Sequence, residues 1–507
     1  MRVRAILSGG KFLVEPDPVR VLVGEPLYWE FVSTLPNRSV KWEVYFHHSS
    51  PFGPTLKSLS VATALAPAAQ ARPGQQVMFE VPGGSQQTGT LVPQLESLGV
   101  SAIRVNLSWY NAAPSPTATT RPAGDLSDPA RYDWRRAQAL IDAAHQRGWK
   151  VTLALAGPAP RCGTEGARDT ITRPRASDYE HFAEAAGRHF GAAVTQWSVW
   201  NEPNFRTFLM PQFVHGKPAS PKIYRGLYLA AQKGLRHVLP HPRVLFGETA
   251  PRAGGDGVAP LAFLRGALCL DSRYHRRGGC GRITTDGYAH HPYAPAAGPY
   301  FRPAGRDDVT IGSLSRLTTA LDRAARAKAI SRRVKVYLTE FGVQSYPDRS
   351  AGVPLATQSD YRSISERIAW SNPRVYGFSQ YLMHDDATIS SRSRAARYPG
   401  FQTGLETASG RRKPAYDGFR LPLVVRAAGS RVAIWGLVRP ARGATRVSVD
   451  AATKGHAWRV LKRLRTKRDG SFSFTSANRR GRVWRVRWTA PSGRHYTGSV
   501  TKARHKP

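Results

Sequence analysis

The sequence predicts an α/β protein, a (β/α)8 TIM barrel followed by a small antiparallel β-sandwich, and two observations predict it. From residue 76 to residue 425, short apolar runs alternate with amphipathic stretches eight times. Apolar strand runs that alternate with helices predict a parallel sheet, and eight repeats predict its closure into a barrel. After about residue 428 the helical pattern gives way to short β-rich runs separated by turn residues, which predict an immunoglobulin-like sandwich.

The expected strands are short runs rich in apolar and aromatic residues. They cover residues 76–81, 101–109, 150–157, 194–202, 243–250, 285–293, 334–342 and 375–383. The expected helices cover 90–99, 133–148, 178–191, 221–239, 260–270, 313–329 and 358–370, with a weaker eighth near 414–425. In the second helix, apolar residues recur on one face, at Ala137, Leu140, Ile141 and Ala144.

A doubly wound open sheet is the alternative to a barrel. It would need a GxGxxG phosphate-binding fingerprint after the first strand. The segment "VPGGSQQTG" has glycines at that place but not this spacing. The barrel is therefore the preferred interpretation.

Three parts follow from the pattern: an N-terminal extension over 1–71, the barrel over 72–425 and a basic β-sandwich over 426–507. Residues 56–71, "LKSLSVATALAPAAQA", resemble the end of a secretory signal peptide in their lysine, apolar run and Ala-Gln-Ala ending. We therefore expect a true start downstream of Met1 and a secreted or cell-wall-associated protein.

The alternative for the N-terminal extension is an Ala/Pro linker behind a small domain. Plausible strands at 20–33 and 39–46 favour this second interpretation. No run of 18 apolar residues occurs, so no transmembrane span is expected.

The chain is strongly basic, with 74 Lys and Arg against 34 Asp and Glu and a net charge of +40. Residues 426–507 hold 21 Lys and Arg but two acids, Asp450 and Asp469. This surplus fits a polyanionic partner such as an anionic cell-wall polymer, or a compositional bias toward arginine. No nucleic-acid-binding motif accompanies it, so a nucleic-acid partner is not expected.

Three cysteines allow one intramolecular pair. Cys269 and Cys280 flank a polar, Gly-rich segment and are the best candidates for a disulfide. Cys162 is expected to be an inert thiol, because nothing near it in the sequence marks it as activated. No Cys or His spacing indicates a metal site, and no cofactor is predicted.

Polar residues gather at the carboxyl ends of the expected strands, where barrels carry their catalytic groups. They are Arg104, Asn106, Asn201, Glu202, Glu248, His290, His291, Tyr293 and Glu340. Two of them, Glu202 and Glu340, end the fourth and seventh strands, which lie across the barrel mouth from each other. Two carboxylates in one pocket can act as the proton donor and the nucleophile of glycoside hydrolysis.

The motifs "WNEPNF", "HHPY" and "LTEFG", on the fourth, sixth and seventh strands, resemble the retaining glycoside hydrolases of clan A. The WNEPN form is most similar to the β-xylosidase and iduronidase family, number 39, with the family 5 type second. The resemblance covers roughly residues 76–425. It implies a glycosidase that cleaves O-glycosidic bonds of an oligo- or polysaccharide by double displacement.

The resemblance also implies roles for individual residues. Glu202 would be the general acid/base and Glu340 the nucleophile. Asn201 would bind the sugar 2-hydroxyl, and Arg104 would lie beside Glu340 and keep it ionised. Tyr293 would orient Glu340. His291 would line the sugar site.

Clan members often carry a Trp at the end of the eighth strand, where this chain has "GFSQYLMHDD". Tyr381 is expected to replace it, with Gln380, His384, Asp385 or Asp386 contacting sugar hydroxyls. The sequence leaves two roles for Glu248, a contact with the sugar or an ion pair with a neighbouring cation. A catalytically inactive carbohydrate- or cell-wall-binding barrel is the alternative function, and the presence of both carboxylates argues against it.

Overall fold

The computed structural model describes residues 75–81, 88–255, 257–393, 395–439, 443–453 and 456–505, and the backbone alone of residues 2–7 and 40–45. The chain divides into two compact units, Met1–Gln70 and Ala71–Pro507. In the first unit, strand β1 (Arg2–Leu7) pairs antiparallel with β2 (Val40–Tyr45), which lies within the strand expected at 39–46. The expected strand at 20–33 and the signal-like segment at 56–71 lie outside the described residues.

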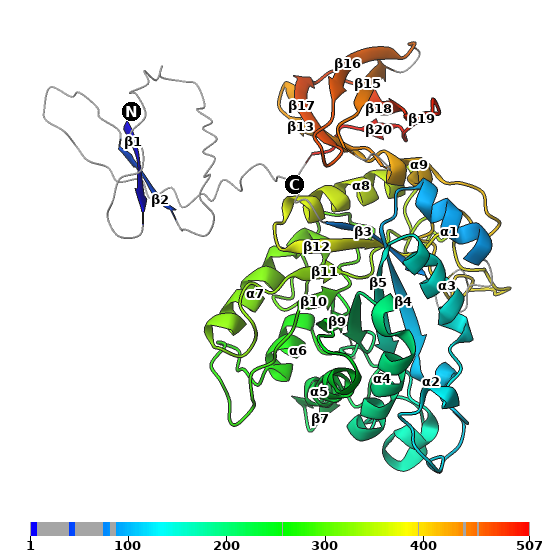
Figure 1. Cartoon of the computed structure of the whole chain (residues 1–507). Helices are drawn as coiled ribbons and strands as arrows, with labels where there is room; N and C mark the ends of the chain where they lie inside the picture. The colour runs from blue at the N-terminus through cyan, green and yellow to red at the C-terminus, as the bar shows by residue number, and fades with distance from the viewer. Residues whose placement is uncertain are drawn as a thin grey trace, which may run out of the picture. The chain divides into compact units, whose positions relative to one another are not determined.

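Eight parallel strands close into a barrel, which confirms the predicted fold (Figure 1). In chain order they are β3 (Gln76–Val81), β4 (Ala102–Ser108), β5 (Lys150–Ala156), β6 (Gln196–Val199), β9 (Val244–Thr249), β10 (Gly287–His290), β11 (Val336–Leu338) and β12 (Val375–Gln380). The last strand pairs with the first, Gly377 to Gln76, and this pairing closes the ring.

Helices follow the strands, as the apolar periodicity predicts. They are α1 (Thr88–Ser97), α2 (Trp109–Ala112), α3 (Arg135–Gln146), α4 (Ala176–Phe190), α5 (Ser220–Val238), α6 (Pro260–Ala267), α7 (Ser315–Arg326), α8 (Leu355–Ser371) and α9 (Pro414–Arg420). In α3 the buried residues are the predicted Ala137, Leu140, Ile141 and Ala144. None of the described helices is long and apolar enough to cross a membrane.

Short elements occupy the connections. A two-stranded hairpin, β7 (Phe213–Val214) and β8 (Lys217–Pro218), precedes α5. Single 3-10 turns cover Pro129–Arg131, Arg161–Gly163, Glu165–Ala167, Gly191–Ala193 and Ile311–Ser313.

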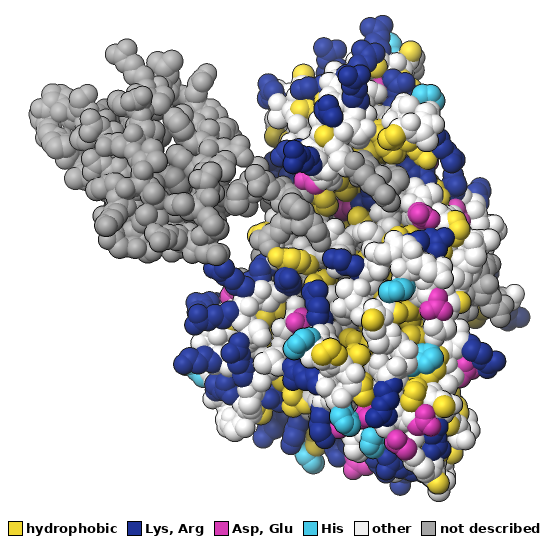
Figure 2. Space-filling model, viewed as in Figure 1, with side chains coloured by type: hydrophobic (Ala, Val, Ile, Leu, Met, Phe, Trp, Pro, Cys, Tyr) yellow, Lys and Arg dark blue, Asp and Glu magenta, His cyan; other side chains and the backbone are white. Residues whose placement is uncertain are grey.

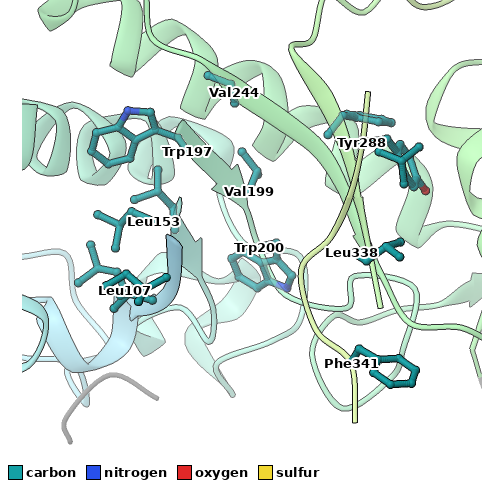
Figure 3. Close-up of a cluster of buried hydrophobic side chains, with 14 of the residues drawn as sticks. Leu107, Leu153, Trp197, Val199, Trp200, Val244, Tyr288, Leu338 and Phe341 are labelled. Atoms are coloured by element: carbon teal, nitrogen blue, oxygen red, sulfur yellow. The ribbon is translucent and has the colours of Figure 1, made fainter. Parts of the chain in front are cut away.

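A buried apolar cluster joins residues of neighbouring barrel strands. Figure 3 shows Leu107, Leu153, Trp197, Val199, Val244 and Leu338 in this cluster, together with Trp200 and Phe341 beyond the strand ends. Trp200 packs edge-on against Tyr179 with ring centres 5.7 Å apart. This core fixes the strand ends from which the candidate site residues emerge.

Two antiparallel sheets form the C-terminal module and confirm the predicted β-sandwich. One contains β13 (Leu423–Ala428), β14 (Arg431–Leu437) and β17 (Ser471–Ala477). The other contains β16 (Arg459–Arg465), β15 (Arg446–Thr453), β18 (Arg482–Thr489), β19 (His495–Thr497) and β20 (Thr501–Lys502). Side chains of both sheets, among them Val432, Ile434, Val449, Trp484 and Val486, share one core.

The segment 414–425, expected as one weak helix, is divided between α9 and β13. Pro422 lies between the two elements, and the residue before a proline is disfavoured in the helical region. Leu421 accordingly has φ −128° and ψ 68°, outside that region. The helix therefore ends at Arg420 and the chain enters the sandwich.

A buried and a partly buried ion pair attach this module to helix α8 of the barrel. Arg439 donates to Glu366, with one contact at 2.8 Å, and Arg504 donates to Asp360 at 2.8 Å. Val424 and Trp435 of the module also share an apolar cluster with Ile364. The sandwich is thus packed against the barrel within one compact unit.

Cys269 and Cys280 form a disulfide, as predicted, and Cys162 is a buried free thiol. Closing a loop of this length stabilises a protein by about 2–3 kcal/mol in the chain-entropy model. We expect the double variant Cys269→Ser/Cys280→Ser to lose about that much unfolding free energy in urea titrations. A reductant should produce the same loss in the wild type and no change in the variant. Unequal effects would contradict the assignment.

Candidate active site

Glu202 and Glu340 meet at the carboxyl end of the barrel. Glu202 follows β6 and Glu340 follows β11. A carboxylate oxygen of Glu202 lies within 4.8 Å of a carboxylate oxygen of Glu340. The structure therefore brings together the two carboxylates that the sequence singles out.

The backbone around these carboxylates is strained. Trp200 and Glu202 have φ values of 65° and 41°, and Glu248, the penultimate residue of strand β9, has 51°. A non-glycine residue in this left-handed region costs on the order of 1–3 kcal/mol, and such residues cluster at functional sites. The same conformation explains why β6 ends at Val199 and not at Glu202, where the sequence predicts the strand end.

Arg104, on β4, is a buried cation that joins four polar side chains. Its Nη1 donates to Glu340 Oε1 at 2.8 Å and contacts Glu80 Oε2 at 2.9 Å. Its Nη2 donates to Glu248 Oε2 at 3.1 Å and to Asn201 Oδ1 at 3.0 Å. The Arg104 side chain has no exposed surface. It therefore positions Glu340 and Asn201 and does not itself reach a substrate.

His291 lies between three carboxylates. Its Nδ1 is 2.9 Å from Glu202 Oε1 and 3.5 Å from Glu340 Oε2, and its Nε2 is 2.7 Å from Glu248 Oε2. Burial opposes the charged form, but the three carboxylates outweigh it and raise the pKa of His291 to about 10. This shift favours the imidazolium form at neutral pH, in which both ring nitrogens can donate. With no exposed surface, His291 holds the carboxylates in place and does not line the sugar site as expected.

Exposure separates the four carboxylates into two pairs. The side chains of Glu80 and Glu248 have no exposed surface, whereas Glu202 is 16% exposed and Glu340 9%. A buried carboxylate cannot contact a substrate. Glu248 is therefore an ion-pair partner of Arg104 and His291, which answers the question that the sequence leaves open.

Tyr293 donates a hydrogen bond to Glu340 Oε2 at 2.8 Å, the orienting contact expected of it. Tyr381 packs edge-on against Tyr293 with ring centres 6.2 Å apart. Phe401 stacks on Tyr293 at 6.0 Å and is 44% exposed. These three rings form an aromatic wall beside Glu340.

The polar residues on either side of Tyr381, at and after the end of β12, bind other parts of the protein. Gln380 is buried, donates to the carbonyl of Thr403 and accepts from Arg362. Asp385 is buried against Lys413 at 2.5 Å. The expectation that Gln380 and Asp385 contact sugar hydroxyls is wrong, because their polar atoms lie inside the protein.

His384 and Asp386 also have partners within the chain. His384 Nε2 pairs with Glu406 at 3.1 Å. The carboxylate of Asp386 accepts from the backbone N–H of Phe401 at 2.6 Å. This second contact holds the loop that carries the exposed Phe401 ring.

The two buried carboxylates titrate in opposite directions. Burial opposes ionisation of Glu248, but Arg104 and His291 outweigh it and lower its pKa to about 2. For Glu80, burial dominates the attraction of Arg104 and raises the pKa to about 8. At neutral pH these shifts favour the anion of Glu248 and the protonated form of Glu80.

These shifts predict how stability depends on pH. Glu80 and His291 have folded-state pKa values above their ordinary 4.5 and 6.5, so their stabilising contributions are lost as pH rises toward 8 and 10. Glu248 has the opposite sign, and its contribution is lost as pH falls toward 2. We expect the melting temperature to fall between pH 7 and 10.

The variant Glu80→Gln keeps a neutral group at this position. It therefore separates the contribution of Glu80 to the pH dependence of stability from that of His291. Between pH 5 and 8, the melting temperature of the variant should depend less on pH than that of the wild type. Between pH 8 and 10, the two melting temperatures should fall equally. Thermal unfolding followed by circular dichroism at constant ionic strength measures both ranges. Parallel curves from pH 5 to 8 would show that Glu80 is ionised in the folded protein.

Glu202, His291 and Glu340 also have the donor types of a metal site, since one ligand atom of each lies within 4.8 Å of the others. A histidine must be neutral at the nitrogen that binds a metal. The raised pKa of His291 and the carboxylate contacts of both its nitrogens oppose this. The cluster fits proton transfer better than metal binding.

Sequence reasoning missed Glu80 and Phe401. Glu80 reads as one polar residue in the apolar run "QVMFEV", and its strand neighbour Arg104 was the available signal, since the parallel register pairs the two directly. Phe401 comes from an irregular loop with no periodic pattern.

The fold is a closed (β/α)8 barrel, and two carboxylates meet at the carboxyl end of its strands. Its solved neighbours include a family 39 glycoside hydrolase from the gut symbiont Bacteroides cellulosilyticus WH2, with a TM-score of 0.50 and 15% identity, over 94% of this chain and 95% of that one. At this identity the comparison establishes the fold. The resemblance to family 39 seen in the motifs remains a prediction, and the barrel fold agrees with it.

Two further solved structures align with lower TM-scores. A glucosidase from Croceicoccus marinus has a TM-score of 0.48 and 12% identity, over 84% of this chain and 96% of that one. A hyperthermophilic β-glucosidase from Pyrococcus furiosus has a TM-score of 0.44 and 13% identity, over 69% and 95%. No protein-family model matches the chain, and no curated protein matches its sequence.

Proposed function

We propose that the protein is a retaining glycoside hydrolase that cleaves O-glycosidic bonds of an oligo- or polysaccharide. The observation that carries the proposal is that Glu202 and Glu340 alone, among the four carboxylates of the cluster, have exposed surface. Their oxygens lie within 4.8 Å. Retaining enzymes place the two carboxyl groups about 5–5.5 Å apart and inverting enzymes about 6.5–9.5 Å apart.

In the first step the ionised Glu340 attacks the anomeric carbon while the bond to the leaving oxygen breaks. Glu202 donates a proton to that oxygen, and a glycosyl-enzyme forms on Glu340. Arg104 and Tyr293 hold the two Glu340 oxygens at 2.8 Å each, which fixes the direction of attack.

In the second step water attacks the same carbon and Glu340 leaves as a carboxylate. Glu202, now ionised, takes the proton from the water. His291 remains within 2.9 Å of Glu202 and stabilises its ionised form between the two steps. Two inversions give net retention.

Asn201, Tyr381 and Phe401 complete the sugar site in this proposal. Asn201 is half-buried and its Oδ1 accepts from Arg104, which leaves its amide N–H groups for a sugar hydroxyl. Tyr381 is half-buried in the aromatic wall. The exposed Phe401 ring offers an apolar face on which a sugar ring can stack.

The test is hydrolysis of a panel of chromogenic aryl glycosides, followed by proton NMR of the first-formed anomer. A turned-over substrate whose anomeric configuration is retained supports the proposal. An inverted first product contradicts double displacement. Sugar binding without turnover on any member would favour an inactive carbohydrate-binding barrel.

We also propose that the protein acts outside the cytoplasm, as a secreted or cell-wall-associated enzyme. The disulfide between Cys269 and Cys280 supports this, because disulfides persist in oxidising compartments. Sequencing the mature N-terminus tests it: a first residue near Arg72 supports export, and an intact Met1 contradicts cleavage of the segment 56–71.

A further inference from the structure

The five-stranded sheet of the C-terminal module has two different faces. Alternate residues of β15 and β18, such as Val447, Val449 and Trp484, are buried in the sandwich core. The residues between them point to the opposite face, where Arg446 and Arg487 are exposed. That outer face is defined below as the arginine face.

The strand register arranges the arginine face in two rows. In one row Arg465 of β16 lies directly opposite Arg446 of β15. In the other, Ser448 lies between Arg463 on one side and Arg487 on the other. These side chains, with hydroxyl groups from β18 and β19, line a cavity of about 1010 Å³.

The charge of this face is only partly neutralised within the chain. Asp450 pairs with Arg487 at 2.6 Å and with Arg485 at 3.4 Å. Among the described residues, Arg446, Arg463 and Arg465 have no acidic partner. Figure 2 shows many Lys and Arg side chains and few acidic ones on the C-terminal module.

Like charges directly opposite each other destabilise an antiparallel pair. The Arg446–Arg465 pair is therefore a cost that folding of the sandwich does not require. An anionic ligand between the two guanidinium groups would offset the repulsion. The sheet thus has the features of a binding surface for repeated negative charges.

We propose that the arginine face binds a carboxylated polysaccharide, a polyuronide, and holds it beside the barrel enzyme. Guanidinium groups match carboxylates with two parallel hydrogen bonds. The hydroxyl groups of Ser448 and Thr497, which also line the cavity, match the hydroxyl groups of sugars. The choice of a polysaccharide among polyanions rests on the proposed glycosidase function.

A single-stranded nucleic acid fits this face less well. Such ligands are bound by exposed aromatic rings on which bases stack. The two aromatic residues of the lining are not free for this: Trp488 is buried, and Tyr496 stacks on it with ring centres 5.4 Å apart. The rest of the lining consists of four arginines, the hydroxyl residues Ser448, Thr489 and Thr497, His495, and the apolar Val447 and Leu464.

The test measures binding of the full chain to fluorescent oligogalacturonate by anisotropy, with Arg446→Gln/Arg465→Gln as the variant. The control variant is Arg479→Gln/Arg480→Gln, which removes the same charge from exposed residues of the turn before β18. We expect the first variant to weaken binding about tenfold or more and the control to change it less than about twofold. Methyl-esterified oligogalacturonate, which lacks the carboxylates, should bind neither the wild type nor the two variants.

Equal losses in the two variants would overturn the proposal, because they would show attraction by net charge alone. If an oligonucleotide of equal charge bound more tightly than the oligogalacturonate, the ligand of this face would be a nucleic acid and not a polyuronide. Hydrolysis of an aryl glycoside by the same variants separates this proposal from the proposed function. Turnover should be unchanged in both, and its absence in the wild type would contradict the enzyme but leave the binding result intact.

Discussion

Replacing Glu340 by alanine is expected to reduce turnover of an aryl glycoside by on the order of 10⁴-fold or more, because Glu202, the other exposed carboxylate of the described cluster, acts as the acid/base and not as the nucleophile. The nearest alternatives, Glu80 and Glu248, have no exposed surface. Azide added to the variant should restore turnover by entering the space of the missing carboxylate. It would form a glycosyl azide of inverted configuration, because a single displacement replaces the two.

The protein should tolerate this substitution. Arg104 keeps its contacts with Glu80 and Glu248 when Glu340 is removed, so no buried cation is left alone. Thermal unfolding of Glu340→Ala next to the wild type checks this. The isosteric Glu340→Gln is the second control, since it retains the volume but not the charge. Full activity of either folded variant would overturn the assignment of the nucleophile.

The barrel could be predicted from the sequence because its signal is local and repeated. Every expected barrel strand coincides with an observed one, and the short β-rich runs expected after about residue 428 form the strands of the sandwich. Errors arise where an element is decided by a single backbone conformation. The left-handed φ of Trp200 ends β6 early, and Pro422 divides the expected last helix.

The site could be predicted in part. Residues on strand ends were found because barrels place reactive groups there. The environment of each residue could not be predicted, because it depends on contacts between strands far apart in the sequence. The roles of Glu80 and Glu248 follow from their burial around Arg104, and burial at this level of detail has no signature in a single strand.

Asn201 and Phe401 illustrate the same limit from the exposed side of the site. Asn201 was found from its place beside Glu202, but its contact with Arg104 needs the fold. Phe401 lies in a loop that Asp386 and Lys413 hold through the backbone of Phe401 and Gln402, and neither residue is part of a periodic pattern. Loop residues of this kind decide which sugar fits, so the substrate is the feature that sequence reasoning reaches last.

Replacing Glu202 by alanine should separate the two steps of the proposed reaction. A dinitrophenyl glycoside needs no proton on its leaving group, so the first step should be largely spared. A glycoside with a poor leaving group should lose about 10²–10⁴-fold in kcat/KM, the usual contribution of a general acid. Because water also loses its general base, the glycosyl-enzyme should accumulate and give a burst of dinitrophenol.

Mass spectrometry of the denatured variant should detect the sugar bound at Glu340. Azide should accelerate the second step and give a glycosyl azide of retained configuration, opposite to the product from Glu340→Ala. His291 keeps Glu248 as a partner at 2.7 Å in this variant, so its charge stays paired and the fold should persist. An equal loss on good and poor leaving groups, without a burst, would show that Glu202 positions the substrate instead of transferring a proton. An inverted azide from Glu202→Ala would exchange the roles of the two carboxylates.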